Sequence, residues 1–200
     1  MSVVIPFDRF RRRTNVPPLL FVEMFEYQLD GPAVRCTDQV ASALANCRTL
    51  LEHARSQGWT VGFTISLSRT QKPKGTGLGW IDGFQPRRRD MVFETGGDSC
   101  YSSSEFAEAM TIAGNCFLLA GFSGERVCLA TLIDAARNGH NAGLIEDATC
   151  VRQMQGLDTA DSHRALVAIA GNHGTILTSR EWLHFGGAPL SNPEPRYDRS

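Results

Sequence analysis

Residues 118–135 read LLAGFSGERVCLATLIDA, and this stretch decides the fold. The apolar run 116–120 predicts a buried strand, and residues 121–124 form a tight turn that contains two glycines. A helix is predicted over 125–138, and its packed side carries Val127, Cys128, Thr131, Leu132 and Ala135. The stretch is therefore a strand, a turn and a helix of the kind that builds parallel sheets.

The same alternation of short apolar runs and helical patterns continues on both sides of this stretch. We predict further strands over residues 19–22, 59–65, 142–145 and 175–178, and one that begins with 91–93. We predict further helices over 37–56, 102–113 and 159–172, the second opened by a capping box of Ser102 and Glu105. This order predicts an α/β fold of three αβα layers with a mostly parallel central sheet of about six strands.

The length and composition suit one folded domain. A chain of 200 residues buries about 70% of the surface that its unfolded form exposes. Apolar residues make up 42% and charged residues 20%, which is typical of a globular protein. We therefore expect a single domain over 1–200, with its core over about 17–184 and a polar tail over 185–200.

Charge and hydropathy argue against nucleic-acid and membrane partners. The formal net charge of −1 gives no general attraction to phosphate backbones or anionic lipid. The arginine runs 11–13 and 87–89 are short and lack interleaved aromatic residues, so we interpret them as solvated surface. No segment approaches the roughly 18 to 20 apolar residues of a membrane span, and the N-terminal apolar run is too short for a signal peptide.

The cysteines and histidines give no sign of a metal site. Six cysteines and five histidines are scattered without the short paired spacing that zinc ligands show. Scattered cysteines are typical of reduced thiols inside the cell. We expect a cytoplasmic protein that holds no metal ion and no other cofactor.

Ligands of a parallel sheet bind at the carboxyl ends of its strands, where loops gather and helices begin. In this chain the rule marks Glu23, residues 66–69, Thr95 and residues 121–127. These segments are the candidate site before any family is considered.

The order of landmarks resembles the isochorismatase-like hydrolase superfamily, also called the cysteine hydrolases, and the resemblance covers about residues 17–184. Its strongest part is the stretch 118–135. The other landmarks are the segment 20–25, His53 with residues 58–65, Pro86 and Asp90 with residues 91–95, residues 146–148, His163, and the last strand with Glu181 and Leu183. The resemblance implies the α/β fold predicted above, a small-molecule substrate and a homo-oligomer.

The catalytic triad of the amidase members of that family is replaced. Their Asp, Lys and Cys correspond to Glu23, Thr95 and Val127, the last of these six residues after Gly121. Cys128 lies one residue later, and a step of about 100° around a helix turns it away from the spot that its neighbour faces. We therefore expect a buried core thiol, and amide hydrolysis through a cysteine thiolate is not supported.

Isochorismatase itself also lacks the cysteine, and its carboxylic acid donates a proton to a vinyl ether. Glu23 keeps a carboxyl at that place. The chain departs from that pattern in two ways, because Thr95 replaces the lysine and Ser123 stands where those members have a tyrosine. Isochorismate is therefore one possible substrate among several.

Glu23 is the predicted catalytic residue, a general acid or base. Burial beside Val22, Met24 and Phe25 is expected to favour the protonated form of its carboxyl. The alternative is a structural carboxylate that backbone N–H groups or an arginine hold in place.

Six further residues are predicted to contact the substrate, namely Phe25, Arg69, Trp80, Thr95, Ser123 and Val127. Phe25 and Trp80 would form the wall of a pocket for a planar or cyclic ligand, or else belong to the core. Arg69 would clamp a carboxylate in place of the missing lysine, or else lie on a solvated loop. Ser123 and the N–H groups that open the next helix would form a cradle for an anion or oxyanion.

Three functions remain open. The first is an enzyme in which Glu23 performs hydrolysis, vinyl-ether cleavage, elimination or isomerisation on a small molecule, cyclic or carboxylated. The second is a catalytically inactive member that serves as a ligand-binding protein or a partner subunit. The third is a cysteine hydrolase in which a shift of register brings Cys128 into the site.

Overall fold

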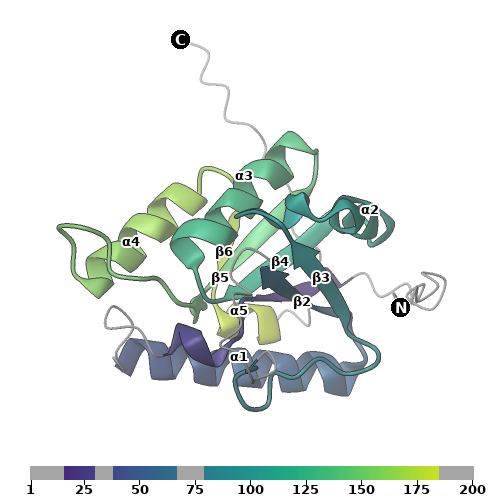
Figure 1. Ribbon diagram of the computed structural model, residues 1–200, viewed down its shortest axis with the longest axis horizontal. Helices are drawn as coiled ribbons and strands as arrows, with labels where there is room; N and C mark the ends of the chain where they lie inside the picture. The colour runs from purple at the N-terminus through teal and green to yellow at the C-terminus, as the bar shows by residue number, and fades with distance from the viewer. Residues whose placement is uncertain (1–15, 30–37, 67–78, 185–200) are drawn as a thin grey trace, which may run out of the picture.

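The computed structural model describes residues 16–29, 38–66 and 79–184 (Figure 1). The arginine run 11–13, Arg69 and the predicted tail lie outside these residues.

The sheet has six strands, and every neighbouring pair is parallel. They are β1 (Leu19–Val22), β2 (Val61–Ser66), β3 (Met91–Thr95), β4 (Cys116–Gly121), β5 (Asn141–Thr149) and β6 (Thr175–Leu177). Their order is β3-β2-β1-β4-β5-β6. From the centre of the sheet, β1, β2 and β3 follow one another to one edge, and β4, β5 and β6 follow one another to the other edge. The boundary between β1 and β4 is a topological switch point, where open α/β sheets bind ligands.

Helices cover both faces of the sheet (Figure 1). One face carries α1 (Asp38–Gln57) and α5 (Ser179–His184), and the other carries α2 (Ser104–Ile112), α3 (Leu129–Arg137) and α4 (Thr159–Ala170). The β1 side chains alternate between the two cores, because successive residues of a strand point to opposite faces. Leu19 and Phe21 join the core that contains Trp182, whereas Leu20 and Val22 join the core that contains Leu132. The predicted three-layer α/β fold is confirmed.

The six predicted strands all form, with small changes at their ends. Trp59 and Thr60, predicted to open the second strand, precede β2. The fifth strand extends from 142–145 to Asn141–Thr149, with a shift of register against β4 between Leu119 and Gly121. None of the described helices has both the length and the apolar character that crossing a bilayer requires.

The predicted capping box at Ser102 is wrong. Residues Cys100–Ser102 form a separate short 3-10 turn, η4, and α2 begins at Ser104 with Ser103 as its N-cap. The Ser102 hydroxyl accepts a hydrogen bond from the Gly97 N–H at 3.0 Å and donates to the Ser99 carbonyl at 2.7 Å. This hydroxyl therefore stabilises the loop before the helix and does not cap the helix itself.

The helix predicted over 125–138 opens differently from an ordinary α-helix. Residues Gly124–Cys128 form a π-helical turn, η5, and α3 follows it. The turn at Gly121 requires glycine, because its φ is +115° and an added Cβ would lie 2.5 Å from the Val22 carbonyl oxygen. The tight turn predicted here therefore presses directly against the end of β1.

Candidate functional site

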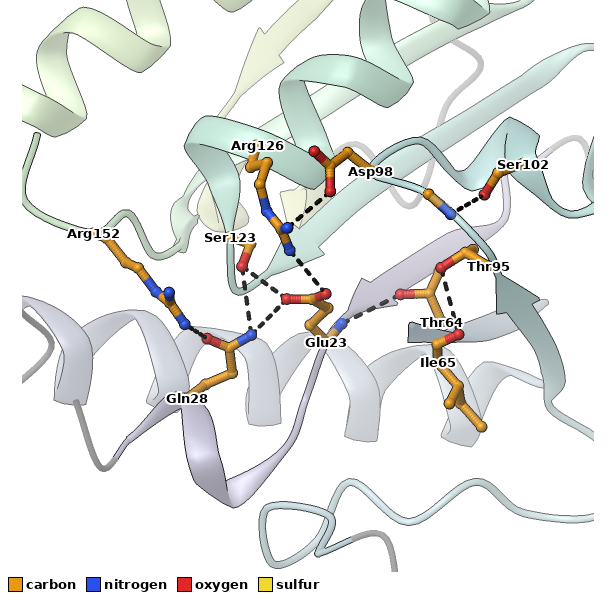
Figure 2. A network of polar contacts seen from close by, with 11 residues as sticks. Glu23, Gln28, Thr64, Ile65, Thr95, Asp98, Ser102, Ser123, Arg126 and Arg152 are labelled. Atoms are coloured by element: carbon orange, nitrogen blue, oxygen red, sulfur yellow. Dashed lines mark hydrogen bonds and ion pairs between the residues drawn. The ribbon is translucent and has the colours of Figure 1, made fainter. Parts of the chain in front are cut away.

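The candidate site lies at the carboxyl ends of β1 and β4, where Glu23 and Ser123 meet (Figure 2). Both residues adopt the left-handed backbone region, with φ of 49° at Glu23 and 57° at Ser123. Left-handed conformations cost about 1–3 kcal/mol in residues other than glycine and concentrate at functional sites. The Glu23 N–H donates to the Thr64 hydroxyl at 3.3 Å. Two strained residues that follow the neighbouring strands β1 and β4 thus meet at the switch point.

The Glu23 carboxyl is buried, with 1% of the residue exposed, and in the described part of the chain three side chains donate to it. The Ser123 hydroxyl and the Gln28 amide donate to Oε2 at 2.8 and 2.5 Å. The Arg126 guanidinium donates to Oε1 at 3.3 Å (Figure 2). This donor set matches an ionised carboxylate, whose oxygens only accept hydrogen bonds.

The expected apolar surroundings of Glu23 therefore need correction. Val22, Met24 and Phe25 are buried as predicted, but their side chains are not the groups that hold the carboxyl. The sequence interpretation missed Gln28 and Arg126. Arg126 lies inside the stretch that decides the fold, one residue before Val127, so its position at the carboxyl end of β4 was a usable signal.

The Gln28 amide is oriented by a second arginine. Gln28 lies in the 3-10 turn η2 (Glu26–Gln28), and its Oε1 accepts a hydrogen bond from Arg152 at 2.9 Å. The Arg152 backbone N–H in turn donates to the Glu125 carboxylate at 3.2 Å. Because Arg152 occupies the oxygen end of the amide, its nitrogen end is directed at Glu23 (Figure 2).

Arg126 connects the buried carboxyl to the surface. Its Nη1 forms an ion pair with Asp98 at 2.8 Å, while its Nη2 contacts Glu23. The Arg126 side chain is 29% exposed and that of Asp98 54% exposed. The positive charge that the sequence interpretation placed on Arg69 is thus supplied, among the described residues, from the turn after β4.

Thr95 does not share the Glu23 contacts. It ends β3, and its hydroxyl donates to the Ile65 carbonyl at 3.4 Å. Figure 2 shows Thr64 between Thr95 and Glu23, as the strand order requires. The structure therefore places Thr95 at the same edge of the sheet, but β2 lies between its strand, β3, and the strand β1 that leads to Glu23.

Phe25 and Trp80 lie together, as the pocket and the core interpretations both require. Their ring centroids are 4.4 Å apart, and the two residues form an isolated antiparallel bridge. The Phe25 ring also stacks on Tyr27, and Trp80 packs against Phe63. Since Phe25 is almost fully buried by these neighbours, its packing favours the core interpretation.

Val127 and Cys128 are both buried in the core that α2, α3 and α4 form with the sheet. Burial raises the pKa of the Cys128 thiol well above its ordinary value. The predicted burial of Cys128 is confirmed, and a buried thiol with a raised pKa is a poor source of thiolate.

Four N–H groups at the predicted backbone cradle already have partners within the protein. The N–H groups of Arg126, Val127 and Cys128 donate to the Ser123 carbonyl, at 3.1, 2.8 and 3.3 Å. The Gly124 N–H donates to the Cys150 carbonyl at 2.9 Å. Three of these donors are thus engaged within the π-helical turn, and the Gly124 N–H is engaged by the Cys150 carbonyl outside it.

No group of three or more acidic, histidine or cysteine side chains in the described part of the chain could hold a metal ion. Arg69, which was predicted to bind the substrate, lies outside that part. The site that the structure assembles is therefore a polar network centred on Glu23 and Ser123.

The chain is similar to several solved structures with the same fold. An isochorismatase from Pseudomonas putida KT2440 is 21% identical, with a TM-score of 0.73, over 84% of this chain and 90% of that chain. A cysteine hydrolase from Pseudomonas syringae pv. phaseolicola 1448A is 15% identical, with a TM-score of 0.71, over 85% and 92%. N-carbamoylsarcosine amidase from Thermoplasma acidophilum is 20% identical, with a TM-score of 0.62, over 82% and 96%.

These identities show the fold alone, and no curated protein matches the chain significantly in sequence. A family model shows the family as well as the fold, because the model of the isochorismatase domain matches residues 18–181. That match covers most of the chain and includes both strands that carry the site. The chain therefore belongs to the isochorismatase family.

Proposed function

We propose that this protein is a small-molecule enzyme, a hydrolase or a lyase, in which Glu23 performs the acid–base chemistry without a cysteine nucleophile. One observation carries the proposal. The Glu23 carboxyl lies at the switch point of the sheet on a strained backbone, and Ser123, Gln28 and Arg126 orient it. Strain at a position that several elements hold in place is typical of functional sites.

Family membership supports a small-molecule hydrolase, and the described thiols argue against the usual nucleophile. Val127 has no reactive group, and the neighbouring Cys128 is fully buried with a raised pKa. A positioned carboxylate can take a proton from water or from a substrate hydroxyl and return it to a leaving group. Arg126 adds a positive charge beside it, which suits a substrate that develops negative charge.

The site also supports a second candidate function, a catalytically inactive protein that binds a ligand or a partner. The observation that favours it is the engagement of Glu23, which is 1% exposed and whose oxygens accept three hydrogen bonds from side chains of the described residues. Such a carboxylate would serve to hold β1, η2 and η5 together.

Glu23→Gln distinguishes the two functions, because it keeps the size of the side chain and removes the carboxylate. Purified protein would be incubated with a panel of small esters, amides and vinyl ethers, and the products would be measured by mass spectrometry. Turnover should fall by about 10² to 10⁴ in Glu23→Gln, with ligand affinity little changed. The matched control is Glu94→Gln, which changes an exposed glutamate on β3 and should leave turnover unaltered.

The enzyme proposal is refuted by two results. One is full turnover in a correctly folded Glu23→Gln variant. The other is the absence of turnover for every compound that stabilises the wild-type protein against heat, which would favour the binding function.

A further inference from the structure

Ser123 has the local geometry of a nucleophile. It lies between a parallel strand, β4, and the helical turn that leads into α3. Its φ and ψ are 57° and 46°, in the left-handed region. A serine on a strained turn between a strand and a helix is the arrangement that exposes the nucleophile in α/β-hydrolases. The order of elements and the strain are shared here, on a different fold, whereas the exposure is not, because Ser123 is 3% exposed.

The Ser123 hydroxyl is not used as a helix cap. Serine at the start of a helix normally accepts a hydrogen bond from a backbone N–H of the first turn. At Ser123 no such side-chain bond forms. The hydroxyl donates to Glu23 Oε2 at 2.8 Å, within the reach that proton transfer requires.

Glu23, the base that accepts the hydrogen bond from Ser123, is itself oriented by other groups. Gln28 donates to the same carboxylate oxygen as Ser123 does, and Arg126 contacts the other oxygen. The Gln28 amide also lies 3.4 Å from the Ser123 hydroxyl oxygen, to which it donates. A hydroxyl bonded to a base that a third group orients is the general signature of an activated nucleophile.

We propose that Ser123 is a nucleophile and that the substrates are esters or amides, an inference that rests on the proposed acid–base role of Glu23. The Ser123 oxygen forms a bond to the carbonyl carbon while its proton passes to Glu23. The bond to the leaving alcohol or amine then breaks, and Glu23 returns the proton to that group. Water attacks the acyl-serine with Glu23 again as the base, which releases the carboxylic acid and restores the hydroxyl.

The Arg126 guanidinium contacts Glu23. It supplies a positive charge and N–H donors for the oxyanion that forms when Ser123 attacks the substrate carbonyl. This role supplements the backbone cradle, in which the N–H groups of Gly124 and Arg126 already donate to the carbonyls of Cys150 and Ser123. Ser123 therefore takes the place of the absent thiol from a position four residues before Val127.

The test is covalent labelling with an alkyl fluorophosphonate, which forms an oxygen–phosphorus bond to an activated serine as fluoride leaves. Intact mass should show one adduct per chain, and peptide mapping should place it on Ser123. The adduct should be absent in Ser123→Ala and in Ser123→Gly, the second of which tolerates a φ of 57° without strain. Labelling should slow by about 10² or more in Glu23→Gln.

Ser103 is the matched control, since its hydroxyl also donates to a carboxylate, that of Glu105 at 3.0 Å. Its backbone is ordinary, with φ of −85°, so Ser103→Ala should label as the wild type does. No adduct in the wild type, or an adduct on another residue, overturns the serine nucleophile. Turnover that depends on Glu23 without an adduct on Ser123 overturns it while the proposed function stands. Equal labelling rates in wild type and Glu23→Gln leave the nucleophile in place and overturn the role of Glu23.

Discussion

Gln28 provides the sharpest test of how the site is held together. Its amide is buried and joins two charged groups, since it donates to the Glu23 carboxylate at 2.5 Å and accepts from Arg152 at 2.9 Å. Gln28→Met keeps the length of the side chain and removes these two hydrogen bonds, together with the longer bond of 3.4 Å to the Ser123 hydroxyl. The substitution therefore probes the polar network with little change of volume.

The expected loss of stability follows from the two hydrogen bonds that Gln28 makes with the charged groups of Glu23 and Arg152. A hydrogen bond to a charged group contributes about 1.5–3 kcal/mol, and a buried group left without its partner costs about 1–3 kcal/mol. Glu23 keeps its bonds from Ser123 and Arg126, and the half-buried Arg152 can be hydrated after the change, so the two contributions are not fully lost. We expect Gln28→Met to lower the free energy of unfolding by about 2–4 kcal/mol.

Urea denaturation followed by circular dichroism measures this free energy. The control is Gln57→Met at the exposed end of α1, which should change stability by less than about 0.5 kcal/mol. In a double-mutant cycle with Arg152→Met, the double variant should lose about 1 kcal/mol less than the sum of the single variants. A loss at Gln28 no larger than that at Gln57, or a cycle without coupling, would refute the orienting role of Arg152.

Four further predictions concern a glycine, a histidine, a tyrosine and two cysteines. Gly121→Ala should lower stability by about 3 kcal/mol or more, measured by thermal unfolding, because its Cβ would lie 2.5 Å from a carbonyl oxygen of β1 at a φ of +115°; a wild-type melting temperature would contradict this. Burial lowers the pKa of His140, so the unfolded state binds more protons and stability should fall as the pH drops below about 6.5. Tyr101→Phe, which removes the hydroxyl 2.6 Å from His140 Nδ1, should cost about 1–3 kcal/mol at pH 7.5, and urea titrations at several pH values check both statements. Iodoacetamide should modify the half-buried Cys116 well before Cys128, as peptide mapping would show, and early loss of the Cys128 thiol would revive the cysteine hydrolase hypothesis.

The elements that sequence patterns predicted are those whose cause is local. Each strand of the sheet is a short apolar run bounded by turn residues, and the packed side of α3 follows helical spacing. The same kind of signal was present for α5 and was overlooked. Thr178 and Glu181 form a capping box, with the Thr178 N–H donating to Glu181 at 2.7 Å and the Glu181 N–H donating back at 3.2 Å.

The errors at local positions arose where two patterns competed. Ser102 and Ser103 both precede a glutamate, and α2 begins at Ser104, two residues later than predicted, because Cys100–Ser102 form a 3-10 turn. The π-helical turn before α3 was not predicted either, since helical spacing does not distinguish a π-turn from the first turn of an α-helix over five residues.

The sequence by itself determined the fold and the family resemblance, and it predicted the two central positions of the candidate site. Glu23 and Ser123 were predicted because each follows an apolar strand, and parallel strands end at one edge of a sheet. Only the tertiary structure decided which groups act on Glu23. Arg126 lies 103 positions away from it, and Arg152 lies 124 positions away from Gln28. Such contacts depend on the pairing of β1 with β4, which sets Val22 beside Gly121, and on the turns η2 and η5 that aim the side chains. No local pattern encodes that pairing, because it is selected by the packing of the whole sheet between its two layers of helices.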